Sequence, residues 1–174
     1  MLQFREATIN DGNSIALLHA ESWRKYYRGI WSAVFLDNDA YKNRMDIWQQ
    51  RLNHPQQNQY ILLAEKDEEL CGFACIYIND DPVFGTLLDN LHVSVQAQGL
   101  GIGTQLMRRM AKKINDYKPG SNFYLWVLEE NYHARKFYEH LNGENHELLR
   151  MKQQDGGFSN TCRYVWKSVN DLIT

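Results

Sequence analysis

A glycine-rich turn is the segment of this chain whose residue types and spacing are best suited to chemistry. Residues 98–103 read Gln-Gly-Leu-Gly-Ile-Gly, after a strand-like pattern and before a helix-like one. At such a junction, free backbone N–H groups and the positive end of the helix dipole favour a phosphate. Three glycines leave the backbone open to close approach, so a phosphate-binding turn is one interpretation, and the alternative is that the glycines serve only a tight turn and close helix packing.

Two other nucleotide-binding motifs also place glycines at a strand–helix junction. A nucleotide-hydrolase loop needs Gly-Lys followed by Ser or Thr, but Gly103 is followed by Thr104 with no lysine between them, which excludes that motif. A dinucleotide-binding fingerprint needs a third small residue that Thr104 does not supply, although Glu129 could imitate its ribose-binding acid. A dinucleotide site therefore stays open as an alternative.

The three cysteines are spaced neither as metal ligands nor as a disulfide framework. Cys71 and Cys75 lie four residues apart on one face of a predicted strand, and Cys162 stands alone. We interpret all three as reduced core thiols and predict no metal site.

Alternating strand and helix patterns surround the turn and must position it. The strand over residues 86–95 is predicted to carry Leu87, Asp89, Leu91, Val93 and Val95 on one face and Leu88, Asn90 and His92 on the other. The helix after the turn has one apolar stripe, formed by Ile102, Leu106, Met110 and Ile114.

The rest of the chain continues this alternation. We predict a strand over residues 2–8, a helix capped by Asn10 or Asp11, a helix over 41–52 and a hairpin of strands 59–65 and 70–78. After the turn and its helix follow a strand over 123–128, a helix capped by Asn131 and stopped at Asn142-Gly143, and strands over 147–153 and 162–169.

Length and composition favour one small domain. The chain has 174 residues, of which 44% are apolar, and we predict a single domain over residues 1–174. A formal net charge of −2 provides no positive field for nucleic acid or an anionic membrane. The longest apolar stretch, residues 70–78, is far shorter than the roughly 20 residues of a membrane span, and no secretory signal is visible, so we expect a cytoplasmic protein.

Two motifs in the right order resemble the GCN5-related N-acetyltransferases (GNAT). The residues that match the coenzyme A motif of this family are Val93, Gln98, Gly101, Gly103 and Leu106; those that match its second motif are Asn131, Ala134, Phe137, Tyr138 and Glu139. The resemblance implies an α/β (α+β) fold with a central mixed, mostly antiparallel sheet of about seven strands flanked by about four helices. It also implies acetyl-coenzyme A as the cosubstrate.

The resemblance carries site residues over to this chain. It implies that the strand before the turn holds the pantetheine arm, that the turn holds the pyrophosphate and that the later helix approaches the cofactor. The cofactor-binding residues implied in this way are Leu91, Val93, Gln98, Gly99, Leu100, Gly101, Ile102, Gly103, Thr104, Asn131, Ala134, Arg135 and Tyr138.

An amine that attacks a thioester must lose a proton, and the departing thiolate needs a hydrogen-bond donor. The family implies Tyr138 as that donor, because a tyrosine with a pKa of about 10 can donate to a thiolate whose thiol has a pKa of about 8.5. A purely structural role in its apolar stripe is the alternative for Tyr138. Asp89 and His92 are the candidates for the base, and a proton route through water is the alternative to both.

A small-molecule amine is the acceptor that the sequence favours. The expected border of its site is the aromatic segment Trp23, Tyr26, Tyr27 and Trp31, together with Asp37 and Asp39, and simple packing of these aromatics against the sheet is the alternative. The alternatives are a protein N-terminus or lysine as acceptor, which would need an open groove, and a non-catalytic module that binds acyl-coenzyme A. Both a monomer and a homodimer remain open.

Overall fold

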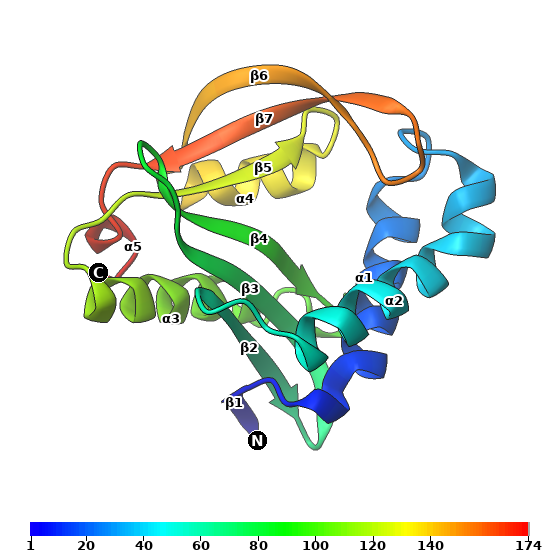
Figure 1. Ribbon diagram of the computed structural model, residues 1–174, viewed down its shortest axis with the longest axis horizontal. Helices are drawn as coiled ribbons and strands as arrows, with labels where there is room; N and C mark the ends of the chain where they lie inside the picture. Colours follow the sequence, from blue (N-terminus) through cyan, green and yellow to red (C-terminus); the bar gives the residue numbers. More distant parts are fainter. Residues whose placement is uncertain (174) are drawn as a thin grey trace.

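In the computed structural model, which describes residues 1–173, seven strands form one sheet in the order β1-β2-β3-β4-β5-β7-β6 (Figure 1). The strands are β1 (Leu2–Glu6), β2 (Gln59–Lys66), β3 (Glu69–Asp81), β4 (Gly85–Val93), β5 (Phe123–Leu128), β6 (Glu144–Lys152) and β7 (Phe158–Trp166). β4 and β5 are parallel to each other, and every other neighbouring pair is antiparallel. The predicted mixed, mostly antiparallel sheet is confirmed.

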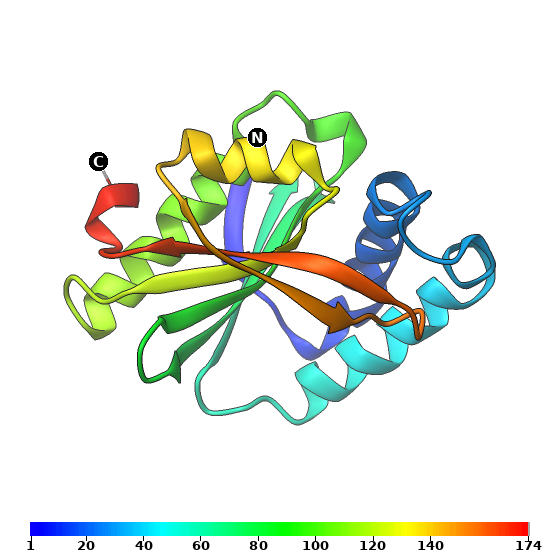
Figure 2. The ribbon, with the colours of Figure 1, turned by 90° about the horizontal axis from the view of Figure 1, so that it is seen from above.

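Helices cover both faces of this sheet, as Figures 1 and 2 show. The helices are α1 (Gly12–Tyr26), α2 (Ala40–Asn53), α3 (Ile102–Tyr117), α4 (Tyr132–His140) and the short α5 (Asn170–Ile173). A π-helical turn, Phe35–Asp39, leads into α2, and 3-10 turns occur at Ile9–Asp11 and Val95–Ala97. α1 and α2 lie against one face, while α3 and α4 lie against the other.

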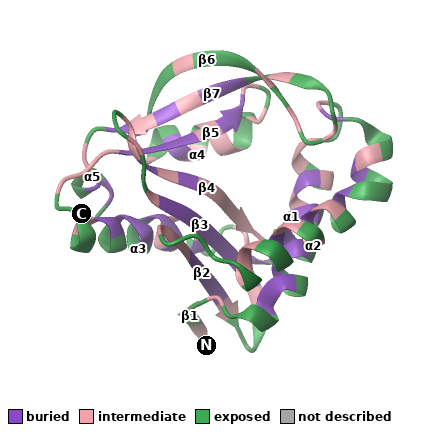
Figure 3. Cartoon of the chain, in the orientation of Figure 1, coloured by how far each residue is buried: buried purple, intermediate pink, exposed green. Residues whose placement is uncertain are grey.

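Each face of the sheet has its own apolar core. The predicted stripe of α3 is buried, and it packs with Ile76, Leu125 and Tyr164 of the sheet. On the opposite face, Ile15 of α1 and Trp48 of α2 pack against Phe73. Figure 3 shows the result, with buried residues concentrated along the central strands and exposed residues along the outer strand β6. Burial of these two helical stripes fixes where α1 and α3 stand relative to β4.

The two parallel strands pair along only part of their length. The β4–β5 ladder joins Thr86, Leu87 and Leu88 to Phe123, Tyr124 and Leu125, although both strands continue beyond it. Past these residues β4 stays paired with β3, and β5 stays paired with β7. The facing edges of β4 and β5 therefore have free main-chain groups, which an extended ligand could pair with.

A β-bulge in β4 overturns the predicted assignment of its faces. Leu88 lies opposite Ile76 and Asn90 lies opposite Cys75, so Asp89 is an extra residue in the strand. As a result Leu88 shares the α3 face with Leu91 and Val93, whereas Leu87 packs into the α1–α2 core. The prediction that Leu87, Leu91 and Val93 share one face was wrong, because a one-residue insertion exchanges the faces of every residue after it.

Several predicted boundaries also move. The strand before the turn ends at Val93, because Val95–Ala97 forms a 3-10 turn. The last two strands begin earlier than predicted, at Glu144 and Phe158.

Asp11 precedes α1 as predicted, but it does not cap the helix through its side chain. Its carboxylate accepts hydrogen bonds from Arg5 (2.8 Å) and from the Thr8 N–H (2.6 Å), and these bonds, that from Arg5 above all, lower the pKa of Asp11 to about 2.

Candidate active site

A cavity of about 710 Å³ lies where β4 and β5 separate. One end is formed by the glycine turn and the starts of α3 and α4, and the other by Trp23 of α1, by Tyr27 and Trp31 in the segment after α1, and by charged residues of α2. The predicted cofactor residues that line it are Leu91, Val93, Gln98, Gly99, Gly101, Ile102, Gly103, Thr104, Asn131, Ala134 and Tyr138. Asp89 and His92 line it as well, so the fold brings together the cofactor and catalytic candidates.

The glycine turn presents unpaired backbone donors to this cavity. Gly99 and Gly101 have φ angles of 78° and 70°, and a Cβ added to either would meet no atom within 4 Å. The first hydrogen bond of α3 runs from the Gln105 N–H to the Gly101 carbonyl (3.0 Å), so residues 102–104 have no helical partner for their N–H groups. Positive φ, open space and free donors at a helix N-terminus are what a pyrophosphate requires.

Gly103 has a different role from the other two glycines. A Cβ at Gly103 would lie 3.3 Å from the ring of Phe137 and 3.8 Å from Val93. The third glycine of the turn therefore permits close packing of α3 against α4.

The side chain of Gln98 connects the turn to α1. It donates a hydrogen bond to the hydroxyl of Tyr26, whose ring stacks on His133 of α4 at a centroid distance of 5.3 Å. Tyr26 was predicted at the acceptor site, but these contacts place it at the cofactor end of the cavity. Tyr27 packs instead with Trp23 and Trp31, at the aromatic end.

The start of α4 confirms one predicted contact and corrects another. Asn131 caps the helix, because its side-chain oxygen accepts the Ala134 N–H at 3.2 Å. Arg135 does not line the cavity: its guanidinium bonds to the Tyr164 hydroxyl (3.2 Å) and to the Glu129 carbonyl (2.9 Å). The side chain of Leu100 is exposed and also lies outside the lining, which leaves only its main chain to contact a cofactor.

Tyr138 is held in the wall of the cavity by aromatic neighbours. It is buried, and its ring packs against Phe137 (5.3 Å) and Trp166 (6.1 Å between centroids). Burial, together with the nearby Tyr27, raises its pKa above the usual value of a tyrosine. The hydroxyl therefore keeps its proton at pH 7 and above, as a hydrogen-bond donor must.

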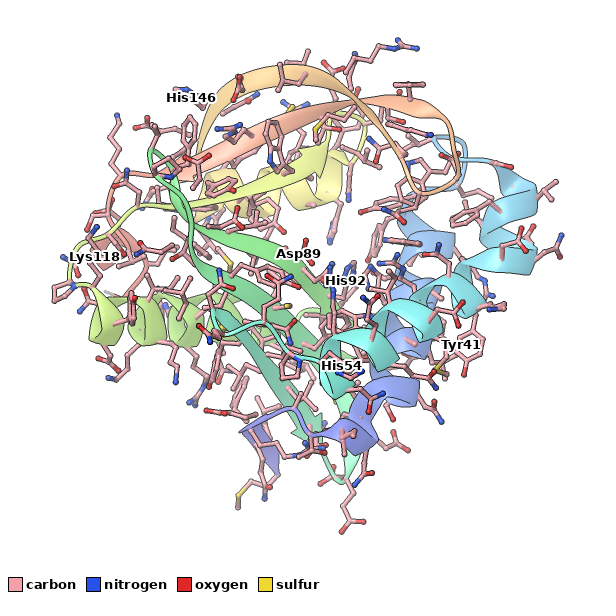
Figure 4. The ribbon with its side chains drawn as sticks, viewed as in Figure 1. Tyr41, His54, Asp89, His92, Lys118 and His146 are labelled. Carbon is pink, nitrogen blue, oxygen red and sulfur yellow. The ribbon has the colours of Figure 1, made fainter. Side chains whose placement is uncertain are left out.

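Asp89 and His92 both belong to β4 and lie between this strand and the α1–α2 pair, but in different environments (Figure 4). The bulge directs Asp89 toward α2, where its carboxylate accepts a hydrogen bond from Arg51 at 2.6 Å. The ring of His92 lies against His19 (4.2 Å between centroids), and its Nδ1 is 2.9 Å from Ser22 Oγ. Burial and the charge of Arg44 lower the pKa of His92 to about 3, so this ring is neutral at pH 7 and only weakly basic.

The aromatic end of the cavity carries a second arginine, Arg44 of α2. Its guanidinium lies 4.2 Å from the ring centroid of Trp23, which also packs edge to face with Trp31 at 4.8 Å. Burial and the charge of Arg51 lower the pKa of Arg44 to about 10, which still leaves it charged at pH 7. By contrast, Asp37 bonds to Arg28 at the surface, and neither Asp37 nor Asp39 lines the cavity, so the prediction for these two acids was wrong.

Comparison with known proteins now decides the family. Residues 19–143 match the model of the acetyltransferase (GNAT) family. This chain belongs to the GNAT family. It is therefore an N-acetyltransferase that depends on acetyl-coenzyme A, as its two motifs implied.

The similarity of this GNAT chain to known proteins extends along its full length. It is 24% identical over 180 residues to the uncharacterized N-acetyltransferase YuaI of Bacillus subtilis, covering 100% of this chain and 98% of the relative. The PaiA N-acetyltransferase of Thermoplasma acidophilum, whose crystal structure contains coenzyme A, has a TM-score of 0.71 at 20% identity and covers 92% of this chain and 98% of its own. A ribosomal-protein-alanine N-acetyltransferase from Brucella melitensis has a TM-score of 0.69 at 18% identity, with coverage of 94% and 98%.

Sequence reasoning missed the charged residues of this GNAT site. Arg44 and Arg51 on α2 line the cavity but were not predicted there, and neither was His19 of α1. A signal was present for one of them: Arg44 lies midway between Ala40 and Trp48 at a spacing of four, and these three are the buried residues of α2. An arginine within an apolar helical stripe indicates a functional contact, because arginine is rarely buried without one.

Among residues 1–173, the structure has no helix both long and apolar enough to cross a membrane. Within the same range, no cluster of three or more His, Cys, Asp or Glu side chains is arranged to hold a metal ion.

The contact between Gln98 and Tyr26 gives a testable prediction. Tyr26→Phe removes the hydroxyl that holds Gln98 and should raise the Kd for acetyl-coenzyme A about three- to tenfold, since a hydrogen bond contributes about 1 kcal/mol. Calorimetric titration measures this change. Tyr41→Phe is a matched control, because Tyr41 is an exposed residue of α2 outside the cavity lining (Figure 4). Equal affinities of the two variants would contradict a role for Tyr26 at the cofactor end.

Proposed function

We propose that this chain transfers the acetyl group of acetyl-coenzyme A to the amine of a small molecule. The observation that carries this proposal is the closure of the cavity at its aromatic end. The turn between β6 and β7 reaches the segment between α1 and α2, where the Asp155 carboxylate accepts the Ser32 N–H at 2.8 Å. Gln154 of the same turn lies 3.4 Å from the Arg44 guanidinium.

These contacts matter for the size of the acceptor. A peptide acceptor needs an open groove that lets its chain continue out of the site on at least one side. The two bridging contacts instead join opposite walls, as the proximity of the β6–β7 turn to α2 in Figure 2 also indicates. A compact amine is the acceptor that such a pocket accommodates best.

The cofactor end fits coenzyme A on the strength of its own geometry. The open space at Gly99 and Gly101 and the free N–H groups of residues 102–104 suit the pyrophosphate. The unpaired edge of β4 at Val93 suits an extended arm that carries amide groups. The Thermoplasma PaiA protein, which shares this fold, was crystallised in complex with coenzyme A, and this supports coenzyme A as the ligand.

Acetyl-coenzyme A supplies a thioester, whose carbonyl carbon the amine attacks. We propose that the Tyr138 hydroxyl donates a hydrogen bond to the sulfur as the carbon–sulfur bond breaks. We propose that Asp89 accepts the proton lost by the amine, directly or through water, because the weakly basic His92 is better suited to hold Ser22 in place. In the overall reaction, the amine loses one proton and the thiol of coenzyme A gains one.

A panel of acceptors tests the proposal. Thiol release should depend on both the protein and a small primary amine, and mass spectrometry of the product should show one added acetyl group. Peptides with a free N-terminus or an internal lysine should react much more slowly. Preferential acetylation of a peptide, in particular one with an N-terminal alanine as the name of the Brucella protein suggests, would contradict a small-molecule acceptor.

A further inference from the structure

Arg44 is a buried cation without a buried anion. Arg44 is only 5% exposed, yet no carboxylate of the described residues lies within salt-bridge distance of its guanidinium. Its Nε and Nη2 atoms bond to the side-chain oxygen of Asn43, and Nη2 also approaches Gln154. Nη1 has no such partner in the described chain. A buried guanidinium normally has an anionic partner, because the cost of removing its charge from water is large.

Two other donors at the same end of the cavity are also unpaired. The indole Nε1 of Trp31 is buried and makes no hydrogen bond to a described residue, although Trp31 is 7% exposed and lines the cavity. An indole N–H can only donate. In addition, His19 accepts a hydrogen bond from Trp48 through Nδ1 (3.1 Å), and its buried Nε2 has no partner within residues 1–173. These donors lack acceptors, which a bound molecule could supply.

The charges along the cavity wall also favour an anionic ligand at this end. The fully charged side chains that line the cavity are those of Arg44, Arg51, Lys152 and Asp89. Asp89 is already paired with Arg51 at 2.6 Å, so it does not neutralise Arg44. His19 and His92 add no positive charge at pH 7, because burial lowers the pKa of both rings. The acceptor end therefore has an excess of positive charge, centred on Arg44.

We propose that the amine acceptor also carries an anionic oxygen group, a carboxylate or a phosphate, and that Arg44 binds this group with help from the Trp31 indole. The inference rests on the proposed small-molecule acceptor and narrows its class. An anion at Arg44 would satisfy the free guanidinium and indole donors together, through charge-assisted hydrogen bonds. An acceptor with a second ammonium group would instead place like charges together at this end of the cavity.

Matched pairs of amines test this inference. 4-Aminobutyrate is compared with butylamine, an α-amino acid with its methyl ester, and phosphoethanolamine with ethanolamine, each with acetyl-coenzyme A and thiol release as the readout. The parent protein should prefer the anionic member of at least one pair by about 10- to 100-fold in kcat/KM, as expected for a charged hydrogen bond. The pair that shows the preference distinguishes a carboxylate from a phosphate.

Arg44→Met keeps the aliphatic stem over Trp23 and removes the charge. The preference for the anionic over the neutral amine should therefore fall to within about threefold, mainly through a higher KM for the anionic amine. Arg44→Lys keeps a positive charge and should retain part of this preference. Arg109→Met is the control: Arg109 is exposed, its guanidinium lies 4.1 Å from the Phe4 ring centroid, and it is outside the cavity lining. The inference is overturned if neutral amines are preferred, or if a folded Arg44→Met slows both members of a pair equally.

A binding measurement separates this inference from the proposed function. If the parent protein acetylates none of these amines, small-amine acetylation fails as a proposal, and the anion site is judged by calorimetry on the coenzyme A-loaded protein with the carboxylate and phosphate probes. Probe binding by the parent that Arg44→Met weakens about tenfold or more supports the site. Binding that is equal in both proteins, or absent from the parent, overturns it.

Discussion

Tyr138→Phe should lower kcat by about 10²- to 10⁴-fold while leaving the affinity for acetyl-coenzyme A close to that of the parent. The variant keeps the ring that packs against Phe137 and Trp166 and removes only the hydroxyl. Burial keeps this hydroxyl protonated, and in the proposed mechanism it is the donor that the departing thiolate would lose in the variant. Steady-state rates with an accepted amine, together with calorimetry, measure both quantities.

Tyr124→Phe is the matched control for this variant. Tyr124 is also largely buried, its hydroxyl donates to Asp80 at 2.5 Å, and it lies outside the cavity lining. Loss of that hydrogen bond should cost about 1 kcal/mol of unfolding free energy and leave turnover unchanged. If Tyr138→Phe behaves in the same way, its role is packing and its catalytic assignment is wrong.

Gly101→Val should raise the Kd for acetyl-coenzyme A by more than about tenfold. Gly101 has a φ of 70°, which a β-branched residue adopts only with strain, and its Cβ would project into the open space of the turn. The added side chain would therefore occupy the path that we propose for the pyrophosphate. Calorimetric titration on variants whose circular dichroism matches that of the parent measures this effect.

Gly120→Val is the control for the effect of backbone strain alone. Gly120 follows α3 with a φ of 67°, and a Cβ there would make only ordinary contacts at 3.8 Å with Ser168 and Asn170. This variant should lose stability to a similar degree, by about 1–3 kcal/mol, and still bind acetyl-coenzyme A as the parent does. Equal affinities of the Gly101 and Gly120 variants would remove the turn from the cofactor site.

Local patterns account for the part of the fold that the sequence predicts. The strand Phe123–Leu128 has the predicted bounds, and the stripe of α3 that starts at Ile102 is buried as predicted. In both cases the signal is the periodicity of apolar residues between glycine or proline breaks, which depends only on neighbouring residues. The glycine turn could be found for the same reason, since its function requires small residues at a strand–helix junction.

The parts that could not be predicted depend on contacts between distant segments. The bulge at Asp89 exists only in the register of β4 against β3, and an unbroken alternation in the sequence gives no sign of it. Arg135 has the helix position that the family motif implies, but Tyr164 of β7 provides its hydroxyl as a partner and holds the guanidinium away from the cavity. Arg44 would be solvated on an isolated helix, and only the packing of α2 beside Trp23 makes it part of the site.

The acceptor site and the cofactor site depend on the same gap between β4 and β5, so the position of the cofactor is the central claim. Amide chemical shifts of isotope-labelled protein, followed during titration with acetyl-coenzyme A, test it directly. The largest shifts should occur in residues 99–104 and at Val93, where unpaired main-chain groups face the cavity. Shifts confined to other surfaces, with these amides unchanged at saturation, would contradict the account.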